Sequence, residues 1–548
     1  MQAPLVRSAA ASSKLAGRVA RGGSWKRRVS SLTSSQYTRH QTGLLLSAKA
    51  AVKETFPAAF AAASSNARFS SSMAPPQLER RGDAELLVRK LQERFPADQV
   101  STSPAVLKAH ATDESFHDVP ESVYPDAVFL PKSTEEVSEA MKIAKEAGSP
   151  VICYGAGTCL EGHLAALQGG LCIDLSAHMN QVLEVNASDM DCRVQAGITR
   201  ATLNEYIRDT GLQFTVDPGA DASIGGMVST GASGTSAVRY GVMRDNVMGL
   251  TCVLEDGRIM KTGTRARKSS AGYDLTSLIV GSEGTLACVT EVSLKLHGQP
   301  ESQAAAVCSF PDVRGAVNSV VTALQYGIPL ARAEFLCANT LKAVAARSDA
   351  IKDLNMSTDS PGLFLEFHGS EASVEEQVMI MKDITEMNGL IGDFHFAYAE
   401  EDRRKLWKAR HEAYWAVQQL RPGCRGSPTD VCVPLSKLPD FVEETMADIA
   451  ETDIPAPLFG HIGDGNFHVI LLARDDEPQE YLDKIFAFND RLVQRAIDNE
   501  GTCTGEHGIG YGKRRWLVKE CGEVAVDAMS AVKRALDPDN RMNPGKAI

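Results

Sequence analysis

Two histidines near the C-terminal end of the chain flank a short turn. His461 and His468 stand on either side of a Gly-Asp-Gly-Asn sequence, and the apolar residues 469–473 that follow predict a buried strand. Imidazoles at the two ends of a tight turn can converge on one point, and their neutral nitrogens suit a first-row divalent metal. We therefore expect His461 and His468 to be two ligands of one metal ion.

A candidate third ligand follows about forty residues later. Glu506 and His507 are neighbours in the glycine-rich stretch 501–510. If this stretch is extended, their side chains point to opposite sides, so that one binds the metal and the other faces a substrate. Two histidines and one carboxylate leave coordination positions open, as a substrate-binding metal site requires. A lone histidine is more often a hydrogen-bonded core residue, but the dense glycines favour a functional use.

Length and composition bound the classes of protein that the chain can be. Its 548 residues exceed what one hydrophobic core usually serves, so two or more domains are expected. The 43% hydrophobic and 23% charged residues are ordinary for a globular protein, and no run of 18 apolar residues predicts a membrane span. The 12 cysteines are scattered without a C-x-x-C pair, which predicts free thiols rather than disulfides or an iron–sulfur cluster.

Residues 1–74 differ in composition from the rest. They hold 11 basic residues against one acid, Glu54, and are rich in serine and alanine. This pattern predicts a mitochondrial transit peptide, with a disordered tail that binds nucleic acid as the alternative. Removing this leader from the 57 basic and 69 acidic residues leaves 46 and 68, a net charge of −22. That charge argues against a nucleic-acid partner and is compatible with docking onto a basic protein.

The remaining chain alternates predicted helices and strands. We expect a helix within 77–95, a strand at 127–131, a helix at 133–147 that Ser133 caps, a strand at 151–154, and a hairpin at 253–260. A domain boundary is predicted near 298–300, and an α+β pattern continues beyond it.

Two glycine-rich stretches in the N-terminal half predict cofactor binding. Residues 155–163 follow a strand, and a turn at that place exposes backbone N–H groups that can cradle a pyrophosphate. The stretch does not match the Rossmann fingerprint, because Leu160 holds the place of the third glycine. Residues 217–235 are small and hydroxyl-rich, as a large flat cofactor requires if backbone is to lie against it. Close backbone packing is the alternative explanation.

Six segments together carry a resemblance to a known family. They are 155–162, 218–241, 281–286, 460–468, 505–510 and 543–546. In order and spacing the chain resembles the FAD-linked 2-hydroxy-acid dehydrogenases, from about residue 110 to its end. The resemblance implies an α+β protein with a two-subdomain FAD-binding domain of the vanillyl-alcohol-oxidase/p-cresol-methylhydroxylase type and an α+β substrate (cap) domain.

The same resemblance implies how the chain is divided. After the leader at 1–74, an FAD-binding domain spans 75–298 and contains an entry helix and two α/β subdomains. A substrate or cap domain with the metal site spans 299–510. The segment 511–548 then returns to the FAD-binding domain, so that Asn543 comes near the flavin.

The resemblance also implies a role for particular residues. FAD is expected to be non-covalent, because Thr158 stands where covalent relatives have histidine. Its contacts are expected from Gly155, Ala156, Gly157, Thr158, Pro218, Gly219, Ser223, Gly225, Gly226, Gly231, Ser233, Gly234, Tyr240, Gly241, Glu283, Gly284, Val289 and Asn543. A divalent metal, zinc or manganese, is expected on His461, His468 and Glu506. His507 is the expected general base, and Arg403, Trp407 and Arg410 are the expected substrate-binding residues.

The implied activity is oxidation of D-lactate or another short D-2-hydroxy acid to the 2-oxo acid. Electrons are expected to pass to cytochrome c or another respiratory acceptor, in the mitochondrial matrix or at the inner membrane without a transmembrane segment. Relatives that act on D-2-hydroxyglutarate have a lysine near the position of Pro428 and an asparagine near Ile470. The residues of this chain favour a short, uncharged substrate side chain.

Three alternatives remain open. One is a D-2-hydroxyglutarate or glycolate dehydrogenase of the same family. Another is a redox-silent transferase similar to the peroxisomal alkylglycerone-phosphate synthase. The last is a catalytically idle flavin-binding subunit, which the complete set of His461, His468, Glu506 and His507 disfavours.

Overall fold

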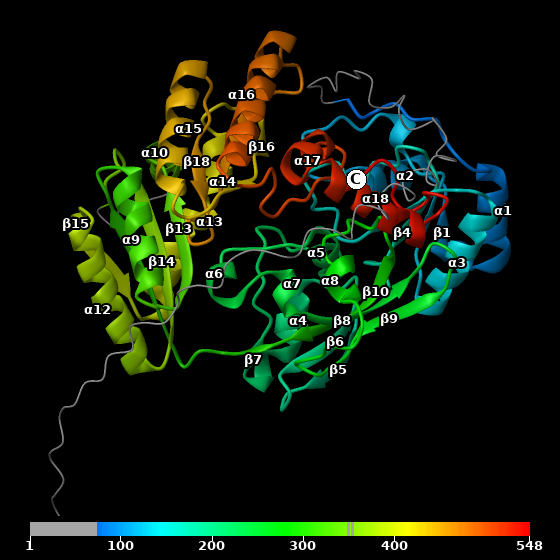
Figure 1. The fold of residues 1–548 in the computed structure, drawn as a ribbon, viewed down its shortest axis with the longest axis horizontal. Coiled ribbons are helices and arrows are strands. Elements are labelled where there is room, and N and C mark those ends of the chain that lie inside the picture. The colour runs from blue at the N-terminus through cyan, green and yellow to red at the C-terminus, as the bar shows by residue number, and fades with distance from the viewer. Residues whose placement is uncertain (1–73, 348–350, 352–355) are drawn as a thin grey trace, which may run out of the picture. The chain divides into compact units, whose positions relative to one another are not determined.

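The computed structural model describes residues 74–347, 351 and 356–548, which belong to one compact unit. The predicted leader, apart from Ala74, lies outside these residues. Three larger sheets, one two-stranded sheet and the helices around them make up the described chain (Figure 1).

The first sheet has four strands in the order β1-β2-β4-β3. They are Val100–Ser101, Ala127–Phe129, Leu171–Asp174 and Val151–Tyr154. Helices α1 (Ala84–Arg94), α2 (Pro104–Ala111) and α3 (Thr134–Glu146) accompany it. The hydroxyl of Ser133 accepts the N–H of Glu136 at 3.3 Å, so α3 begins where the sequence predicted. The other half of the capping box is absent from this helix, because the Glu136 carboxylate accepts the N–H of Lys132 instead.

The second sheet is antiparallel, in the order β5-β6-β10-β8-β9. Its strands are Val182–Asn186, Asp191–Gln195, Cys288–Lys295, Val247–Val253 and Ile259–Gly263. Helices α4 (Arg200–Ile207), α5 (Ile224–Thr230), α6 (Ala237–Tyr240), α7 (Met243–Asn246) and α8 (Leu275–Ile279) lie in its connections. Strands β8 and β9 form the predicted hairpin, and Gly257 supplies the positive φ of +84° that its turn requires. The short strands β7 (Leu212–Gln213) and β11 (His297–Gly298) pair separately.

The third sheet has eight strands in the order β15-β12-β14-β13-β18-β19-β16, with β17 paired to β19. They are Ile391–Ala397, Ser302–Ser309, Gly362–Gly369, Leu330–Leu336, Leu458–Gly460, Asn466–Ala473, Arg425–Pro428 and Val431–Cys432. Side chains of β12 alternate between two apolar clusters, Ala304 and Ala306 entering one and Ala305 and Val307 the other. Both faces of the sheet are therefore covered.

Different helices cover the two faces of this sheet. Helices α9 (Val313–Gln325), α12 (Glu371–Met387), α15 (Leu438–Thr452) and α16 (Gln479–Asp498) contribute to the first cluster. Helices α10 (Ala338–Arg347), α13 (Glu400–His411) and α14 (Ala413–Gln418) contribute to the second. The polar side chains of β13 point toward α13, which places them beside the candidate site.

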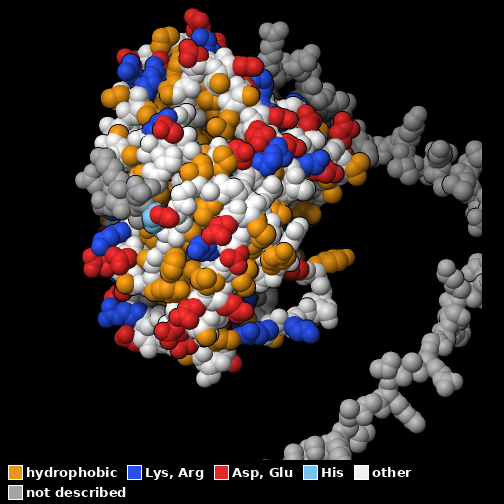
Figure 2. Space-filling view, turned by 90° about the vertical axis from the view of Figure 1, so that its left-hand side faces the viewer, with side chains coloured by type: hydrophobic (Ala, Val, Ile, Leu, Met, Phe, Trp, Pro, Cys, Tyr) orange, Lys and Arg blue, Asp and Glu red, His pale blue; other side chains and the backbone are white. Residues whose placement is uncertain are grey.

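The surface on the α12 side carries charges of both signs. Figure 2 shows Asp and Glu side chains interspersed with Lys and Arg side chains and with apolar ones on this face. The two signs are not separated into patches there. Over the residues that the structure describes, no helix is long and apolar enough to cross a membrane.

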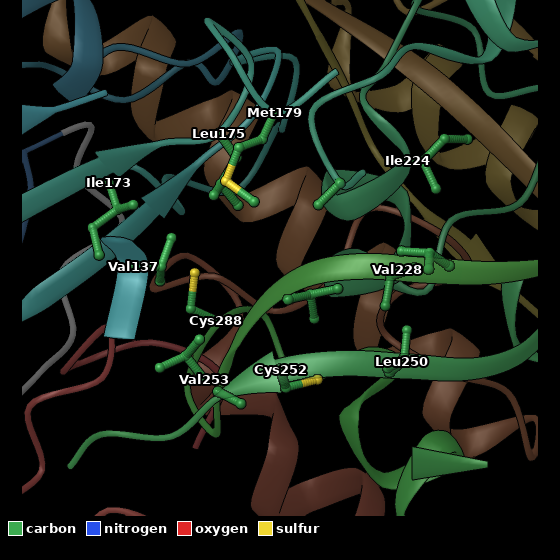
Figure 3. Packing of buried hydrophobic residues seen from close by; sticks show 14 of the residues in the cluster. Val137, Ile173, Leu175, Met179, Ile224, Val228, Leu250, Cys252, Val253 and Cys288 are labelled. Carbon is green, nitrogen blue, oxygen red and sulfur yellow. The ribbon is translucent and has the colours of Figure 1, made fainter. Parts of the chain in front are cut away.

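The core of the N-terminal half joins its two larger sheets. Figure 3 shows Val137 of α3 beside Cys288 of β10 with Ile173 of β4 nearby, and Val228 of α5 facing Leu250 of β8 farther along the same cluster. The buried residues of this cluster come from the chain up to Leu296, with Met542 near the C-terminus as one addition. Those of the next cluster begin at Ala304. The cysteines are free thiols. The domain limits at 298 and 510 stay predictions, since the described residues form one compact unit.

The C-terminal segment returns to the first sheet after α17 (Arg514–Cys521) and α18 (Glu523–Leu536). Met542 pairs in parallel with Val151 of β3, and Asn543 donates its N–H to the carbonyl of Val151 at 2.8 Å. Arg541 is 1% exposed, forms an ion pair with the buried Glu255, and also donates to the carbonyls of Glu255 and Ser149. Asn543 is thus held in place by a buried charge pair two residues earlier.

Substituting Arg541→Ala should lower the free energy of unfolding by about 3 kcal/mol, because removing one member of a buried ion pair leaves the other uncompensated. Lys145 still contacts Glu255 at 2.7 Å, which keeps the expected loss at the lower end of the usual range. Urea denaturation followed by tryptophan fluorescence measures it. In the control, Arg258→Ala removes an exposed pair with Asp256 and should cost less than about 1 kcal/mol. Equal losses in the two variants would contradict the assignment.

Candidate active site

His461 directly follows β18, and His468 lies within β19, so that the turn between the two strands separates them. Both are buried, with 8% and 5% of their surface exposed, and the predicted buried strand after His468 is β19. Gly465 turns the chain with φ of +81°, and a Cβ atom there would lie 2.1 Å from the carbonyl oxygen of Val433. Only glycine fits that position.

The two imidazoles direct the same nitrogen at Glu506. The Nε2 atoms of His461 and His468 lie 3.4 and 3.2 Å from Oε1 of Glu506. Nδ1 of His461 lies 2.6 Å from Oε1 of Glu334, and Nδ1 of His468 lies 2.8 Å from the carbonyl oxygen of Thr429. Each Nδ1 therefore has its own acceptor, which orients the ring and leaves Nε2 for a ligand.

These three predicted ligands form a compact donor set. Their ligand atoms lie within 4.8 Å of one another. Burial lowers the pKa of His461, but Glu334 and Glu506 raise it more, to well above its usual value. Burial raises the pKa of Glu506, but His461 and His468 lower it more, to well below its usual value. Two imidazole nitrogens and a carboxylate oxygen fit a first-row divalent cation, which would replace the protons of this cluster.

Glu334 on β13 is a residue of the site that the sequence analysis missed. It is fully buried between His461 and Arg410, whose Nε lies 2.8 Å from Oε2 of Glu334. Because a buried carboxylate needs a partner, a single glutamate inside the apolar strand Leu330–Leu336 was the signal that could have identified it.

The side chain of His507 packs against His468, which also contacts Glu506. The side chains of Glu506 and His507 therefore do not point to opposite sides of the loop. The two rings stack with centroids 5.2 Å apart and planes 4° apart. Residues 501–510 form bends instead of an extended strand, because the N–H groups of Glu506 and His507 both donate to Oδ2 of Asp430 at 2.9 Å. The expectation of opposite side-chain directions depended on an extended loop and does not hold here.

His507 is built to stay neutral. Part of the residue is exposed, but its Nδ1 is buried and has no hydrogen-bond partner among the described residues. Desolvation lowers the pKa of His507 to about 4 despite the opposing effect of Asp430. At neutral pH its imidazole is therefore unprotonated and can accept a proton.

A second set of possible ligands overlaps the first. Ligand atoms of Asp430, His468 and His507 also lie within 4.8 Å of one another. Asp430, however, already accepts hydrogen bonds from Asn466 Nδ2, Thr504 Oγ1 and two backbone N–H groups. A carboxylate with these four donors has little capacity left for a metal, which favours the set that contains Glu506.

The three predicted substrate-binding residues lie on α13. Arg410 faces the metal-ligand set through its pair with Glu334. Arg403 donates to the carbonyl and side-chain oxygens of Gln303 and to the carbonyl of Tyr398. Arg403 and Arg410 are seven positions apart, about 10 Å along the helix axis, and it is Arg410 that shares the partner Glu334 with His461. Trp407 is 5% exposed, and its Nε1–H lacks an acceptor in the described chain.

The two positions expected to select substrate length lie opposite each other. Pro428 of β16 and Ile470 of β19 are paired residues of the sheet. Ile470 is fully buried in the same apolar cluster as Trp407 and Phe459. Neither side chain can bind a distal carboxylate, as the sequence analysis assumed.

The predicted cofactor residues converge from separate segments. Gly155 lies against Ser223, so closely that a Cβ atom on Gly155 would be 2.1 Å from the serine hydroxyl. Gly157 has φ of +75°, and among the described residues the N–H groups of 156–158 have no acceptor. This turn fits a phosphate group, which offers the missing acceptors.

Three further glycines, Gly231, Gly281 and Gly284, lie close to one another or to the C-terminal segment. Gly231 faces Gly281, and the nearest atom to a Cβ on Gly284 would be Nδ2 of Asn543 at 4.0 Å. Asn543 donates that Nδ2 to the carbonyl of Glu283 at 2.9 Å. These backbones leave room against which a flat ring system can lie.

The other predicted cofactor residues have varied surroundings. Val289 is a buried core residue on β10, and the hydroxyl of Tyr240 contacts Nδ1 of His368 at 2.7 Å. Glu283 directs its carboxylate at the loop that carries His507, accepting the N–H groups of Ile509 and Gly510. The remaining ones lie in or beside α5 and α6; they are Pro218, Gly219, Gly225, Gly226, Ser233, Gly234 and Gly241. Direct contact of any of these with FAD stays a prediction.

Comparisons with known proteins agree with this geometry. A family model described as "FAD binding domain" matches residues 125–263, and one described as "FAD linked oxidases, C-terminal domain" matches residues 299–547. The glycine segments lie mainly in the first match, and both histidine motifs lie in the second.

Curated relatives are similar over most of the chain. A protein of Danio rerio named "Probable D-lactate dehydrogenase, mitochondrial" is 50% identical over 452 residues, which cover 82% of this chain and 89% of that protein. A protein of Arabidopsis thaliana named "D-lactate dehydrogenase [cytochrome], mitochondrial" is 41% identical, covering 85% and 82%.

A solved structure shares the fold. The structure of p-cresol methylhydroxylase with substrate bound superposes with a TM-score of 0.69 at 17% identity, covering 84% of this chain and 96% of that one. The expected α+β architecture of the vanillyl-alcohol-oxidase type is confirmed. Identity this low carries no statement about substrate.

The low pKa of His507 predicts that its ring stays unprotonated in mildly acidic solution. In metal-free protein with ¹³C-labelled histidine, the His507 resonance should not shift between pH 8 and about 5, whereas free histidine titrates near 6.5. The signal is assigned by its loss in His507→Gln. A midpoint between pH 6 and 7 for this resonance would contradict the burial argument.

Proposed function

The chain belongs to the family of FAD-linked oxidases that includes the mitochondrial D-lactate dehydrogenases, and from this membership we propose that it oxidises D-lactate to pyruvate. The observation that supports the activity most directly is the convergence of His461 and His468 on Glu506 beside the neutral His507. This arrangement provides an open metal-binding set and a base within one small volume.

FAD is the cofactor of the reaction. When bound, it supplies the two-electron acceptor for the hydride that leaves C2 of the substrate. The glycine turn at 155–158 offers free N–H groups to its pyrophosphate, and the backbones of Gly231, Gly281 and Gly284 offer a surface for its rings. Thr158 cannot form the covalent link that a histidine forms, which supports non-covalent binding.

A divalent metal, zinc or manganese, is the second group that we propose for the site. Held by His461, His468 and Glu506, it would supply a Lewis acid at the substrate hydroxyl. Glu334 and the carbonyl of Thr429 keep both Nε2 atoms available, and Arg410 compensates the charge of Glu334. The identity of the metal follows from loading experiments rather than from the donor set, which suits either ion.

His507 is the proposed general base. Oxidation of the secondary alcohol releases one proton from the hydroxyl and one hydride from C2. The buried Nδ1 of His507 has no partner in the described chain, and the low pKa of the ring keeps it free of a proton beforehand. The imidazole can therefore take the hydroxyl proton as the hydride departs.

Arg410 and Trp407 are the proposed substrate-orienting residues. Arg410 uses Nε to bind Glu334, and a guanidinium has further N–H groups that can bind the substrate carboxylate. The indole N–H of Trp407 is buried and has no acceptor among the described residues, which supports a contact to substrate. Arg403 is engaged elsewhere and less suited to this role. The apolar pair of Pro428 and Ile470 favours a methyl group over a distal carboxylate.

The chain acts in the mitochondrion and passes its electrons to a cytochrome, as the names of its relatives describe for those proteins. The predicted leader is compatible with this location. Cytochrome c is the acceptor that we propose. Peripheral contact with the inner membrane stays a prediction.

Mixing the anaerobic FAD-loaded protein with D-lactate should bleach the flavin absorbance rapidly, whereas L-lactate and D-2-hydroxyglutarate should not. Removing the metal by chelation should abolish bleaching, and His507→Ala should slow it about a hundredfold to ten-thousandfold, because the base is lost. Stopped-flow absorbance measures these rates.

The outcomes separate the alternatives. Bleaching by D-2-hydroxyglutarate instead of D-lactate would preserve the chemistry and overturn the argument from Pro428 and Ile470. Bleaching that survives complete metal removal would remove the metal from the proposal. If no 2-hydroxy acid bleaches the flavin, the result contradicts the dehydrogenase assignment and favours a redox-silent transferase of the same fold.

Replacing Glu334→Gln should weaken Mn²⁺ binding about tenfold to a hundredfold, because glutamine has one acceptor oxygen and cannot accept both Nδ1 of His461 and Nε of Arg410. Calorimetric titration of metal-free protein measures the dissociation constant. Glu255→Gln is a matched control, since it removes another buried, ion-paired carboxylate far from the histidines. An unchanged dissociation constant in Glu334→Gln would show that Glu334 does not support a metal ligand.

A further inference from the structure

The loop 502–513 carries both Glu506 and His507, and the structure explains how it is held. We infer that Asp430 is the positioning residue that sets the metal-binding carboxylate and the base in place, with Glu283 as its counterpart on the other side of the loop. The inference deepens the proposed function and rests on it for the roles of Glu506 and His507. The contacts themselves are independent of those roles.

Asp430 lies after β16 and is 1% exposed. Its Oδ2 accepts the N–H groups of Glu506 and His507 at 2.9 Å and the hydroxyl of Thr504 at 2.7 Å. Its Oδ1 accepts Nδ2 of Asn466 at 2.9 Å. One carboxylate thus links the loop to β19, the strand that carries His468, since Asn466 is the first residue of that strand.

The neighbours of Asp430 require a carboxylate rather than an amide. All four of its hydrogen-bond partners are donors, and Nζ of Lys513 lies 3.7 Å from Oδ2 as a further cation. An asparagine has the same shape but must direct its NH₂ group at one side or the other. In either orientation a donor would face a donor, and a buried N–H would lose its acceptor.

Glu283 holds the next part of the same loop from the N-terminal half. Its two oxygens accept the N–H groups of Ile509 and Gly510 at 2.6 and 2.8 Å, and His163 lies 3.1 Å from Oε2. Glu283 has φ of +55°, a left-handed conformation that is uncommon for a glutamate. The surrounding contacts therefore hold this backbone in a costly conformation.

Lys513 connects the two sides. Its Nζ lies 2.9 Å from Oε1 of Glu161, which belongs to the glycine stretch 155–163, and 3.7 Å from Asp430. Lys513 and Glu161 are both buried. The loop that carries the base is therefore tied to the cap side by Asp430 and to the cofactor side by Glu283 and Glu161. The N–H groups of residues 506, 507, 509 and 510 all donate to protein carboxylates, so none of these four depends on solvent for an acceptor.

Hydrogen exchange of the FAD-loaded protein tests the holding of the loop directly. In Asp430→Asn, peptides that cover residues 502–508 should exchange at least about tenfold faster than in the unsubstituted protein, because the neutral amide either turns its NH₂ group toward the loop or offers a weaker acceptor than a carboxylate does. In Glu283→Gln the faster exchange should shift to residues 509–510. Asp448→Asn is the matched control, since Asp448 of α15 binds Arg491 and Arg495 of α16. It should leave exchange of 502–510 unchanged.

Kinetics then distinguish positioning from a general loss of structure. In Asp430→Asn, flavin reduction at saturating D-lactate should slow about tenfold to a hundredfold, the usual effect of removing a residue that orients a ligand. KM for D-lactate should change less than threefold, and FAD content should stay stoichiometric. Asp448→Asn should retain the full rate even where its melting temperature falls.

Two results would overturn the inference. One is unchanged exchange of residues 502–508 in Asp430→Asn, and the other is a full rate of flavin reduction in a variant whose loop exchanges faster. If D-lactate never reduces the flavin of the unsubstituted protein, the proposed function fails, whereas the exchange experiment still decides whether Asp430 holds the loop.

Discussion

Four carboxylates, three of them buried and that of Glu506 partly exposed, surround one small volume of this protein, and the site is arranged to compensate them. Glu334, Asp430, Glu283 and Glu506 come from four separate segments of the chain. An uncompensated charge in such a position costs several kcal/mol, so each must find cations or hydrogen-bond donors. Glu334 has His461 and Arg410, and Glu283 has His163 and two N–H groups. Asp430 has four donors, and Glu506 has the two imidazoles that a metal would share with it.

The four carboxylates have different partners and therefore different roles. Asp430 and Glu283 accept hydrogen bonds from backbone N–H groups and so hold the loop 502–513 in its conformation. Glu334 binds His461 with one oxygen and Arg410 with the other, and so fixes the orientation of the His461 ring. Among the four, Glu506 alone has only imidazole nitrogens as partners of its carboxylate in the described contacts. The carboxylate that remains available for a metal is therefore set by what the other three already bind.

The active residues lie where the two halves of the molecule meet. The eight-stranded sheet supplies the histidine turn and Glu334, whereas the N-terminal half supplies the glycine turns and Glu283. The C-terminal segment closes the arrangement by adding Met542 to the first sheet and bringing Asn543 to Glu283. The shared fold with p-cresol methylhydroxylase fixes the frame, and the side chains at this meeting place decide the chemistry.

The sequence by itself determined the parts of the protein that depend on local patterns. The cap at Ser133, the hairpin at Asp256 and Gly257, the strand after His468 and the glycine turns follow from residue types a few positions apart. The motifs together also indicated the family. Only the tertiary structure decided which acceptor each buried donor finds, because those partners are distant in the chain. Asp430 meets Glu506 across 76 residues, and Ile509 meets Glu283 across 226. For the same reason Arg410, rather than Arg403, came to lie beside the histidines, and the loop of His507 bent instead of extending.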